Sequence, residues 1–243
     1  MIRKLLKAAS TVYVTIPYWD RLLEPYAPPN TFRSQWLPVP SAIPSVVDPE
    51  GVAALRSRIL PDGGMIIGNF GTFHDVIGEM VVATLPPILL GRPDRVGIVI
   101  GRGGEPFAAR LRAQYPELDR RLIATGGIDR EEVARFLQAC DLVVQPYPDG
   151  VCTKRSSVMA ALANGAAVAT TLGPISEPFW ESSNAVALAP DSDLAQLVRV
   201  SERLLVQPNE RQRLGHAGQE LYEREFSLPH LVERLTGEDR RLP

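Results

Sequence analysis

Five consecutive residues, Thr-Lys-Arg-Ser-Ser at positions 153–157, place two cations and three hydroxyl groups side by side. The sequence predicts that a helix opens near Thr153, where the first backbone N–H groups have no partner within the helix and the helix dipole adds partial positive charge. Lys154 and Arg155 add full charges, and Gly150 lets a ligand approach the backbone closely. These features favour the binding of a phosphate or diphosphate. The alternative is that one hydroxyl only caps the helix and that both cations are solvated.

The residues on either side of this segment form a strand–helix–strand pattern that would hold it in place. An apolar strand at 142–145 leads into a loop broken by proline and glycine at 146–150, and a second strand follows at 167–171. The helix therefore starts at the carboxyl end of one strand and returns to a parallel neighbour, as in a βαβ unit.

Three further strand–helix pairs precede this unit. The predicted strands lie at 65–70, 96–100 and 121–125, and the predicted helices begin near Val76, run through Arg112 and span 130–138. Apolar strands that alternate with helices of this length predict an α/β fold with a doubly wound parallel sheet.

Glycine-rich turns follow each of these strands, at Gly71, at Gly101–Gly104 and at Gly126–Gly127, and Asp149-Gly150 follows the strand at 142–145. Ligands of open parallel sheets bind beyond the carboxyl ends of the strands. We therefore expect these turns to converge on one crevice. The run Gly101-Arg102-Gly103-Gly104 does not have the GxGxxG spacing of a dinucleotide site.

The chain before residue 46 follows a different pattern. A strand at 11–16, a helix at 18–23 and a strand at 35–39 lead into a proline-rich linker, which predicts a first unit at 1–45 and a second at 46–243. Asp48 is placed to cap a helix that runs from residue 49 to about 60. Three further helices are predicted at 191–206, 209–224 and 228–235.

Composition excludes several classes of protein. The 243 residues are 45% hydrophobic and carry a net charge of -2, which argues against a general nucleic-acid binder. No stretch reaches the roughly 20 apolar residues that a membrane span needs, and polar residues interrupt the basic N-terminal segment, which leaves at most contact with a membrane surface. The two cysteines form no metal motif; Cys140 is expected in the core, and a reducing cytoplasm suits both.

Several motifs carry a resemblance to a known family. They are PYPDGVCTKRSSVMAALANGAAVATTLG, IIGNFGTFHDVIGEM, VIGRGGEPFAARL, ATGGIDREEVARFLQACDL and EREFSLPHLVERL. In this order they resemble the retaining GT-B glycosyltransferases of the large family four, above all a bacterial branch with a pattern close to PYxDGxSTRRxSLMAALAHGxPVVTT. The likeness covers roughly residues 10 to 236. It implies a nucleoside-diphosphate sugar as donor, an unknown acceptor, and no cofactor or metal.

The resemblance also implies roles for particular residues. Lys154 and Arg155 would hold the phosphates and stabilise the leaving group. The donor site would include Gly71, Thr72, Arg102, Gly126, Ile128, Asp149, Gly150, Thr153 and Ser156. Gly71 and Thr72 would face the diphosphate, Arg102 the nucleotide, and 126–128 the base, while Cys152 falls where the family has serine and would line the pocket. Ordinary turn chemistry for the glycines and a solvated Arg102 are the alternatives.

The sequence departs from the wider family at two places. The usual glutamate pair separated by seven residues is missing; Asp149 lies near the first position, and Met159 or Ala160 occupies the region of the second. The arginine and lysine that commonly follow the first strand of the donor-binding domain, here the strand at 65–70, are absent, and residues 69–76 stand in their place. Lys154 and Arg155 would supply the displaced charge. Glu177 is the carboxylate we next expect at the sugar.

The histidines are scattered. His74 is within reach of the crevice from its loop, whereas His216 and His230 have the pattern of surface residues.

A complete family member would have roughly one more α/β domain before Thr11, and residues 11–39 resemble only its last strand, helix and strand. The sequence is therefore expected to be a fragment or one half of an assembly whose partner chain carries the acceptor groups. The resemblance further implies that the terminal helix crosses back to the N-terminal unit. Two functions stay open: a glycosyltransferase, or its donor half, and a module that binds a nucleotide sugar without catalysis. An epimerase of similar fold is a more distant alternative.

Overall fold

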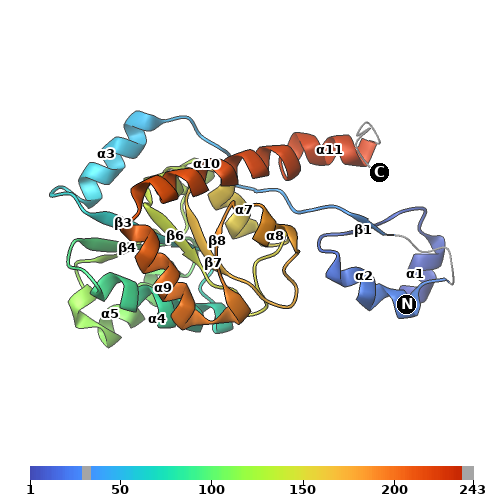
Figure 1. Cartoon of the computed structure of the whole chain (residues 1–243), viewed down its shortest axis with the longest axis horizontal. Helices are drawn as coiled ribbons and strands as arrows, with labels where there is room; N and C mark the ends of the chain where they lie inside the picture. The colour runs from blue at the N-terminus through green and yellow to red at the C-terminus, as the bar shows by residue number, and fades with distance from the viewer. Residues whose placement is uncertain (29–33, 237–243) are drawn as a thin grey trace.

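A computed structural model describes residues 1–28 and 34–236 of the chain, except for the side chain of Asp75. Residues 29–33 of the predicted first unit and 237–243 of the predicted second unit lie outside the described residues. Figure 1 shows a larger lobe built around a sheet, a smaller N-terminal lobe, and a pair of helices that runs along the larger lobe toward the smaller one.

The core of the larger lobe is a six-stranded parallel sheet with the strand order β5-β4-β3-β6-β7-β8. Its strands are β3 (Met65–Phe70), β4 (Arg95–Ile100), β5 (Leu122–Ala124), β6 (Leu142–Gln145), β7 (Val168–Thr171) and β8 (Ala187–Ala189). The predicted fold class is confirmed, and β8 is an addition to the predicted strands. Chain order runs outward from β3 in both directions, so the sheet reverses its winding between β3 and β6. A parallel sheet opens a crevice at such a reversal.

Helices cover both faces of the sheet because successive strand residues point to opposite sides. Ile66 packs with one set of helices and Ile67 with the other. The first face is covered by α3 (Pro49–Ile59), α6 (Arg130–Ala139), α7 (Ser156–Ala163) and α10 (Pro208–Glu225), and the second by α4 (Asp75–Leu90), α5 (Gly104–Gln114) and α9 (Leu194–Leu205). Short helical segments are η2 (Pro116–Leu118), α8 (Phe179–Ser182) and η3 (Pro190–Ser192).

The N-terminal lobe contains a small parallel sheet of two strands, β1 (Val12–Val14) and β2 (Ser34–Trp36). Both strands are shorter than predicted. Two helices and a turn accompany them: α1 (Ile2–Ala8), which the sequence pattern did not predict, α2 (Tyr18–Leu23) and η1 (Glu24–Tyr26). Residues 37–48 then cross to the larger lobe without helix or strand, and the Asp48 side chain caps α3 as predicted by accepting a hydrogen bond from the Gly51 N–H.

The C-terminal helices connect the two lobes. Helix α11 (Leu228–Thr236) continues from α10 toward the N-terminal lobe (Figure 1). The Arg234 guanidinium lies 5.2 Å from the centre of the Trp36 ring in β2, and the Tyr222 hydroxyl accepts a hydrogen bond from the Ser41 N–H in the linker. The terminal helix thus contacts the N-terminal unit, as the resemblance implied.

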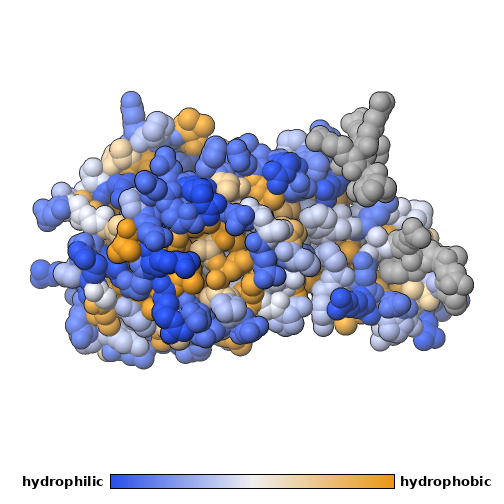
Figure 2. All heavy atoms as spheres, in the orientation of Figure 1, coloured by the Kyte–Doolittle hydropathy of each residue, from blue (hydrophilic) through white to orange (hydrophobic). Residues whose placement is uncertain are grey.

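The surface is mixed in character. Figure 2 shows hydrophilic residues over most of the visible face of both lobes, with hydrophobic residues gathered near the middle of the larger lobe. Within the described residues, no helix is both long enough and apolar enough to cross a membrane.

Candidate functional site

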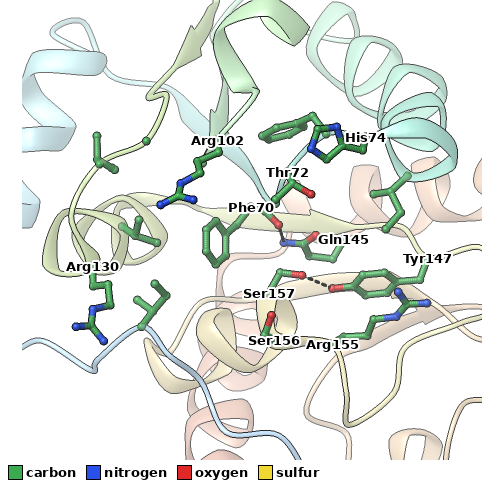
Figure 3. A pocket seen from close by; sticks show the side chains of 18 of the residues that line it. Phe70, Thr72, His74, Arg102, Arg130, Gln145, Tyr147, Arg155, Ser156 and Ser157 are labelled. Carbon is green, nitrogen blue, oxygen red and sulfur yellow. Dashed lines mark hydrogen bonds between the residues drawn. The ribbon is translucent and has the colours of Figure 1, made fainter.

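A crevice of about 490 Å³ opens at the carboxyl ends of the central strands. Its walls are the loops that follow β3, β4, β5 and β6, together with the first turn of α7 (Figure 3). These four loops meet because the strands are parallel and the winding reverses between β3 and β6. The predicted convergence of the glycine-rich turns is therefore seen for three of the four.

Seven of the twelve predicted site residues line this crevice: Gly71, Thr72, Arg102, Ile128, Lys154, Arg155 and Ser156. The other five lie outside it: Gly126, Asp149, Gly150, Thr153 and Glu177. His74 also lines the crevice, whereas His216 lies on the exposed side of α10 beside Glu220 and His230 lies near Glu233.

Glycines allow the loops after β3 and β4 to pack against each other. Gly101 has φ +115°, and a Cβ there would lie 2.4 Å from the Gly71 carbonyl oxygen. Gly103 has φ +80°, and its Cβ would lie 2.8 Å from the Thr72 carbonyl oxygen. A side chain at either position would push the loops apart. A Cβ at Gly71, in contrast, meets no atom within 4 Å, so its backbone faces open space at the crevice wall.

This difference gives a direct test of the crevice. We expect Gly71→Val to leave thermal stability unchanged, since the fold has room for the side chain, and to weaken nucleoside diphosphate binding about tenfold or more by filling ligand space. Calorimetric titration and a melting curve measure the two effects. Gly101→Val is the control, for which we expect a lower melting temperature. Unchanged binding in a stable Gly71→Val protein would mean that no ligand reaches this wall.

The cationic end of the crevice lies at the start of α7. The helix begins at Ser156, three residues later than predicted, because residues 153–155 form a turn in which the Arg155 N–H donates to the Cys152 carbonyl. The predicted opening at Thr153 is corrected accordingly. Ser156 and Ser157 are therefore the hydroxyls in the first helical turn, and Lys154 and Arg155 lie just before it.

Each of these two cations contacts an aromatic ring. Arg155 forms an ion pair with Asp149, and its guanidinium lies 4.6 Å from the centre of the Tyr147 ring. The Lys154 ammonium lies 5.4 Å from the centre of the Trp19 ring in the N-terminal lobe. Burial raises the pKa of the Tyr147 hydroxyl to about 12, so it keeps its proton and shares a hydrogen bond of 2.8 Å with Ser157.

The opposite end of the crevice is apolar. The side chains of Phe70, Ile128 and Val133 line it together with Ile43 from the linker. Arg102 lies above the Phe70 ring in Figure 3, and Arg130 lies at the same end. A flat aromatic ligand would find an apolar wall here with hydrogen-bond donors at its rim.

The charged side chains that line the crevice are all positive. Four cationic side chains, Arg102, Arg130, Lys154 and Arg155, line it, and no acidic side chain does among those that the structure describes, which exclude the side chain of Asp75. Charge of one sign in a partly enclosed cleft attracts ligands of the opposite sign. In the described part of the chain, no three His, Cys, Asp or Glu residues are grouped as ligands for a metal ion.

Thr153 and Glu177 form a buried hydrogen-bond centre beside the crevice. The two Glu177 carboxylate oxygens accept bonds from the Thr153 N–H at 3.1 Å and the Trp180 indole N–H at 2.8 Å. The Thr153 hydroxyl lies 2.5 Å from Glu177 Oε1 and 2.6 Å from the Thr15 carbonyl oxygen, and it accepts from the Trp36 indole. These bonds tie the N-terminal lobe to the larger lobe, and neither Thr153 nor Glu177 lines the crevice.

The remaining three residues outside the crevice contact neighbouring loops and side chains of the protein. Gly150 has φ +94°, and a Cβ there would lie 2.3 Å from the Gly173 nitrogen, so its glycine permits contact between two protein loops. Gly126 has φ +61° and lies next to the Glu105 carboxylate. Asp149 forms an ion pair with Arg155, which lines the crevice.

Cys152 does not line the crevice, contrary to expectation. It is fully buried between Ile16 and Ile175, and Cys140 is buried in the core as predicted. Burial raises the pKa of both thiols. Because the folded protein holds these protons more tightly than the unfolded chain, their contribution to stability is present below about pH 8.5 and is lost at higher pH.

We therefore expect neither thiol to react with Ellman's reagent in the native protein at pH 8, because both are shielded and protonated. Both should react within minutes in denaturant. Absorbance at 412 nm measures the reaction, and rapid labelling of the native protein would contradict the burial of Cys152.

Sequence reasoning missed several lining residues that lie at the ends of strands. Phe70, Gln145 and Tyr147 read as the last residues of apolar strands or as part of a loop. Their place at the carboxyl end of a predicted strand could have identified them, because the residue that ends a parallel strand faces the edge where ligands bind. Counting seven intervening residues on from Asp149 leads to Ser157, which lines the crevice, and not to Met159 or Ala160, which are buried in the core.

The fold and crevice define a class of structure. The six-stranded parallel sheet with helices on both faces matches in fold the Rossmann-like domains of solved GT-B glycosyltransferases. Sucrose-phosphate synthase from Thermosynechococcus elongatus superposes with a TM-score of 0.75 at 20% identity over 98% of this chain and 60% of its own. HepE of Anabaena, in complex with UDP and glucose, gives a TM-score of 0.74 at 13% identity over 99% and 66%.

A shorter structure matches only the larger part of the chain. The C-terminal domain of a group 1 family glycosyl transferase from Francisella tularensis gives a TM-score of 0.59 at 19% identity and covers 76% of this chain and 96% of its own. The chain spans 60% and 66% of the length of the first two proteins. No protein-family model and no curated protein matches the sequence.

Proposed function

We propose that the crevice binds a nucleoside-diphosphate sugar and that the protein acts in the transfer of this sugar to an acceptor. The observation that carries the proposal is the crevice lining, which has four cationic side chains and no acidic one in the described part of the chain. Its apolar end, lined by Phe70 and Ile128, suits a nucleobase, and its cationic end at Lys154 and Arg155 suits a diphosphate.

The same lining suits the chemistry of transfer. Breaking the bond between the sugar and the diphosphate leaves negative charge on the departing phosphate oxygens. Lys154, Arg155 and the amides at the start of α7 would stabilise that charge as it develops, without a metal ion. Retention of the anomeric configuration is part of the proposal and rests on the resemblance to retaining enzymes. The fold shared with HepE, whose structure contains UDP and glucose, supports the donor assignment.

A module that binds the donor without transferring the sugar is the second candidate. It is favoured by the crevice lining, which offers no carboxylate as a base among the side chains that the structure describes, those outside 29–33, 237–243 and Asp75. We propose that groups for the acceptor come from a further α/β domain, supplied by this polypeptide or by a partner chain. Two buried unpaired thiols suit a reducing cytoplasm as the site of action.

Release of nucleoside diphosphate separates the two candidates. The protein is incubated with UDP-glucose, GDP-mannose and ADP-glucose, and product formation is followed with coupled enzymes. We expect release from one donor that is faster than in the Lys154→Ala/Arg155→Ala protein. Binding of the donor without release above that control would contradict transfer by these residues and leave the binding module.

A further inference from the structure

The Arg155 guanidinium is held from two sides. Its side chain is 16% exposed and forms an ion pair with Asp149, whose own side chain lies outside the crevice. The central carbon of the guanidinium lies over the Tyr147 ring, 4.6 Å from its centre (Figure 3). A guanidinium that is both paired and stacked has lost most of its rotational freedom before any ligand arrives.

The stacking ring is itself fixed. Tyr147 is 2% exposed, and its hydroxyl forms a hydrogen bond with Ser157 in the first turn of α7. Its backbone N–H and carbonyl oxygen both bond to the Thr171 hydroxyl in β7. The ring is therefore anchored to a strand at one end and to a helix at the other.

One donor of Arg155 has no acceptor. Arg155 Nε is buried and makes no hydrogen bond with any described residue. A buried donor without an acceptor is unfavourable, and a guanidinium has five N–H groups of which Asp149 takes only part. Arg155 also lines the crevice, so the N–H groups of its guanidinium that face the crevice are open to an acceptor oxygen of a ligand.

We propose that Asp149 and Tyr147 are positioning residues that hold Arg155 in the orientation in which it binds a phosphate group of the donor. This rests on the proposed function for its ligand, but the holding of Arg155 is a property of the protein alone. Asp149 acts as the anchor of the guanidinium from behind and makes no contact with the sugar. Without the Asp149 carboxylate, Arg155 would keep its positive charge in the crevice, but its guanidinium would no longer be held in one orientation.

Two measurements test this separately. The first observes Arg155 Nε–H by ¹H–¹⁵N NMR in the protein without ligand. We expect an ordered signal in the unchanged protein and motional averaging in Asp149→Asn and Tyr147→Leu. Tyr147→Phe should keep the order because it keeps the ring. Equal averaging in the unchanged protein and in Asp149→Asn would overturn the proposal even if nucleotides bind.

The second measurement is a double-mutant cycle on binding of UDP and GDP, with inorganic pyrophosphate as a probe of the charge alone. We expect Asp149→Asn to weaken binding about tenfold in the unchanged background and to have no effect in Arg155→Lys, whose ammonium cannot use the same geometry. Asp94→Asn, which breaks the exposed pair with Arg92, is the matched control. Equal losses in both backgrounds, or tighter binding in Asp149→Asn, would overturn the positioning role. An ordered Arg155 in a protein that binds none of the probes would contradict the proposed function and leave the holding of Arg155 intact.

Discussion

The Lys154→Ala/Arg155→Ala protein is expected to bind nucleoside diphosphates at least about 100-fold more weakly than the unchanged protein. Charge-assisted hydrogen bonds contribute about 1.5–3 kcal/mol each, so the loss of two amounts to about 3 kcal/mol or more. Binding of the uncharged nucleoside should change little, because the apolar end at Phe70 and Ile128 is intact. The measurement is calorimetric titration of both ligands into both proteins.

A matched control removes the same two charges elsewhere. Arg3 and Lys4 are neighbouring exposed cations in α1, outside the crevice. Arg3→Ala/Lys4→Ala changes the net charge by the same amount and should leave diphosphate binding within about twofold, since screening weakens distant exposed charges. Equal losses in the two double variants would show that Lys154 and Arg155 act only through overall charge. Equal losses of nucleoside and diphosphate binding would contradict a phosphate contact.

Replacing Glu177 with glutamine is expected to destabilise the protein by about 2–3 kcal/mol. Both carboxylate oxygens of Glu177 accept hydrogen bonds from buried donors, Thr153 N–H on one side and the Trp180 indole on the other. An amide has one oxygen and one NH₂ group, so one of these donors would face another donor. A buried donor without an acceptor costs about 1–3 kcal/mol, and a bond to a charged group is lost as well.

The expected change in melting temperature is a fall of about 5–10 °C for a chain of this size. Because Thr153 also holds the Thr15 carbonyl and the Trp36 indole, limited proteolysis should cut the N-terminal lobe faster in Glu177→Gln. Glu181→Gln, four residues further on and exposed, is the control and should have no effect. Unchanged stability with a weaker affinity for the donor would instead support the sequence-based expectation that Glu177 contacts the sugar.

The strands of the sheet were the most predictable part of the fold. The run Met65–Phe70 is apolar and ends at a glycine turn, and β3 has these bounds. Strand β8 was missed because Ala187–Ala189 is short and rich in alanine, and it forms only by pairing with β7. Pro86 and Pro87 lie inside α4 without ending it, since the buried apolar face of this helix packs against the sheet and α9.

The site was predictable where local chemistry fixes it and not where tertiary contacts do. Gly71 and Lys154 lie in loops that follow strands of the parallel sheet, and both line the crevice at the carboxyl edge, where ligands of such sheets bind. Thr153 and Glu177 have the residue types of a ligand site, but they bond to each other, and Thr153 also bonds to the N-terminal lobe. The sequence alone does not show whether a polar side chain faces a ligand or bonds to another residue of the protein, as Thr153 does to Glu177, 24 residues further along the chain.

The most direct test of the central proposal is calorimetric titration of the unchanged protein with UDP, GDP and ADP. The crevice geometry predicts that at least one of them binds at a single site with a Kd near or below about 100 µM, and that binding weakens as salt is added. Absence of binding by all three at millimolar concentration would contradict the assignment of the crevice as a nucleotide-sugar site.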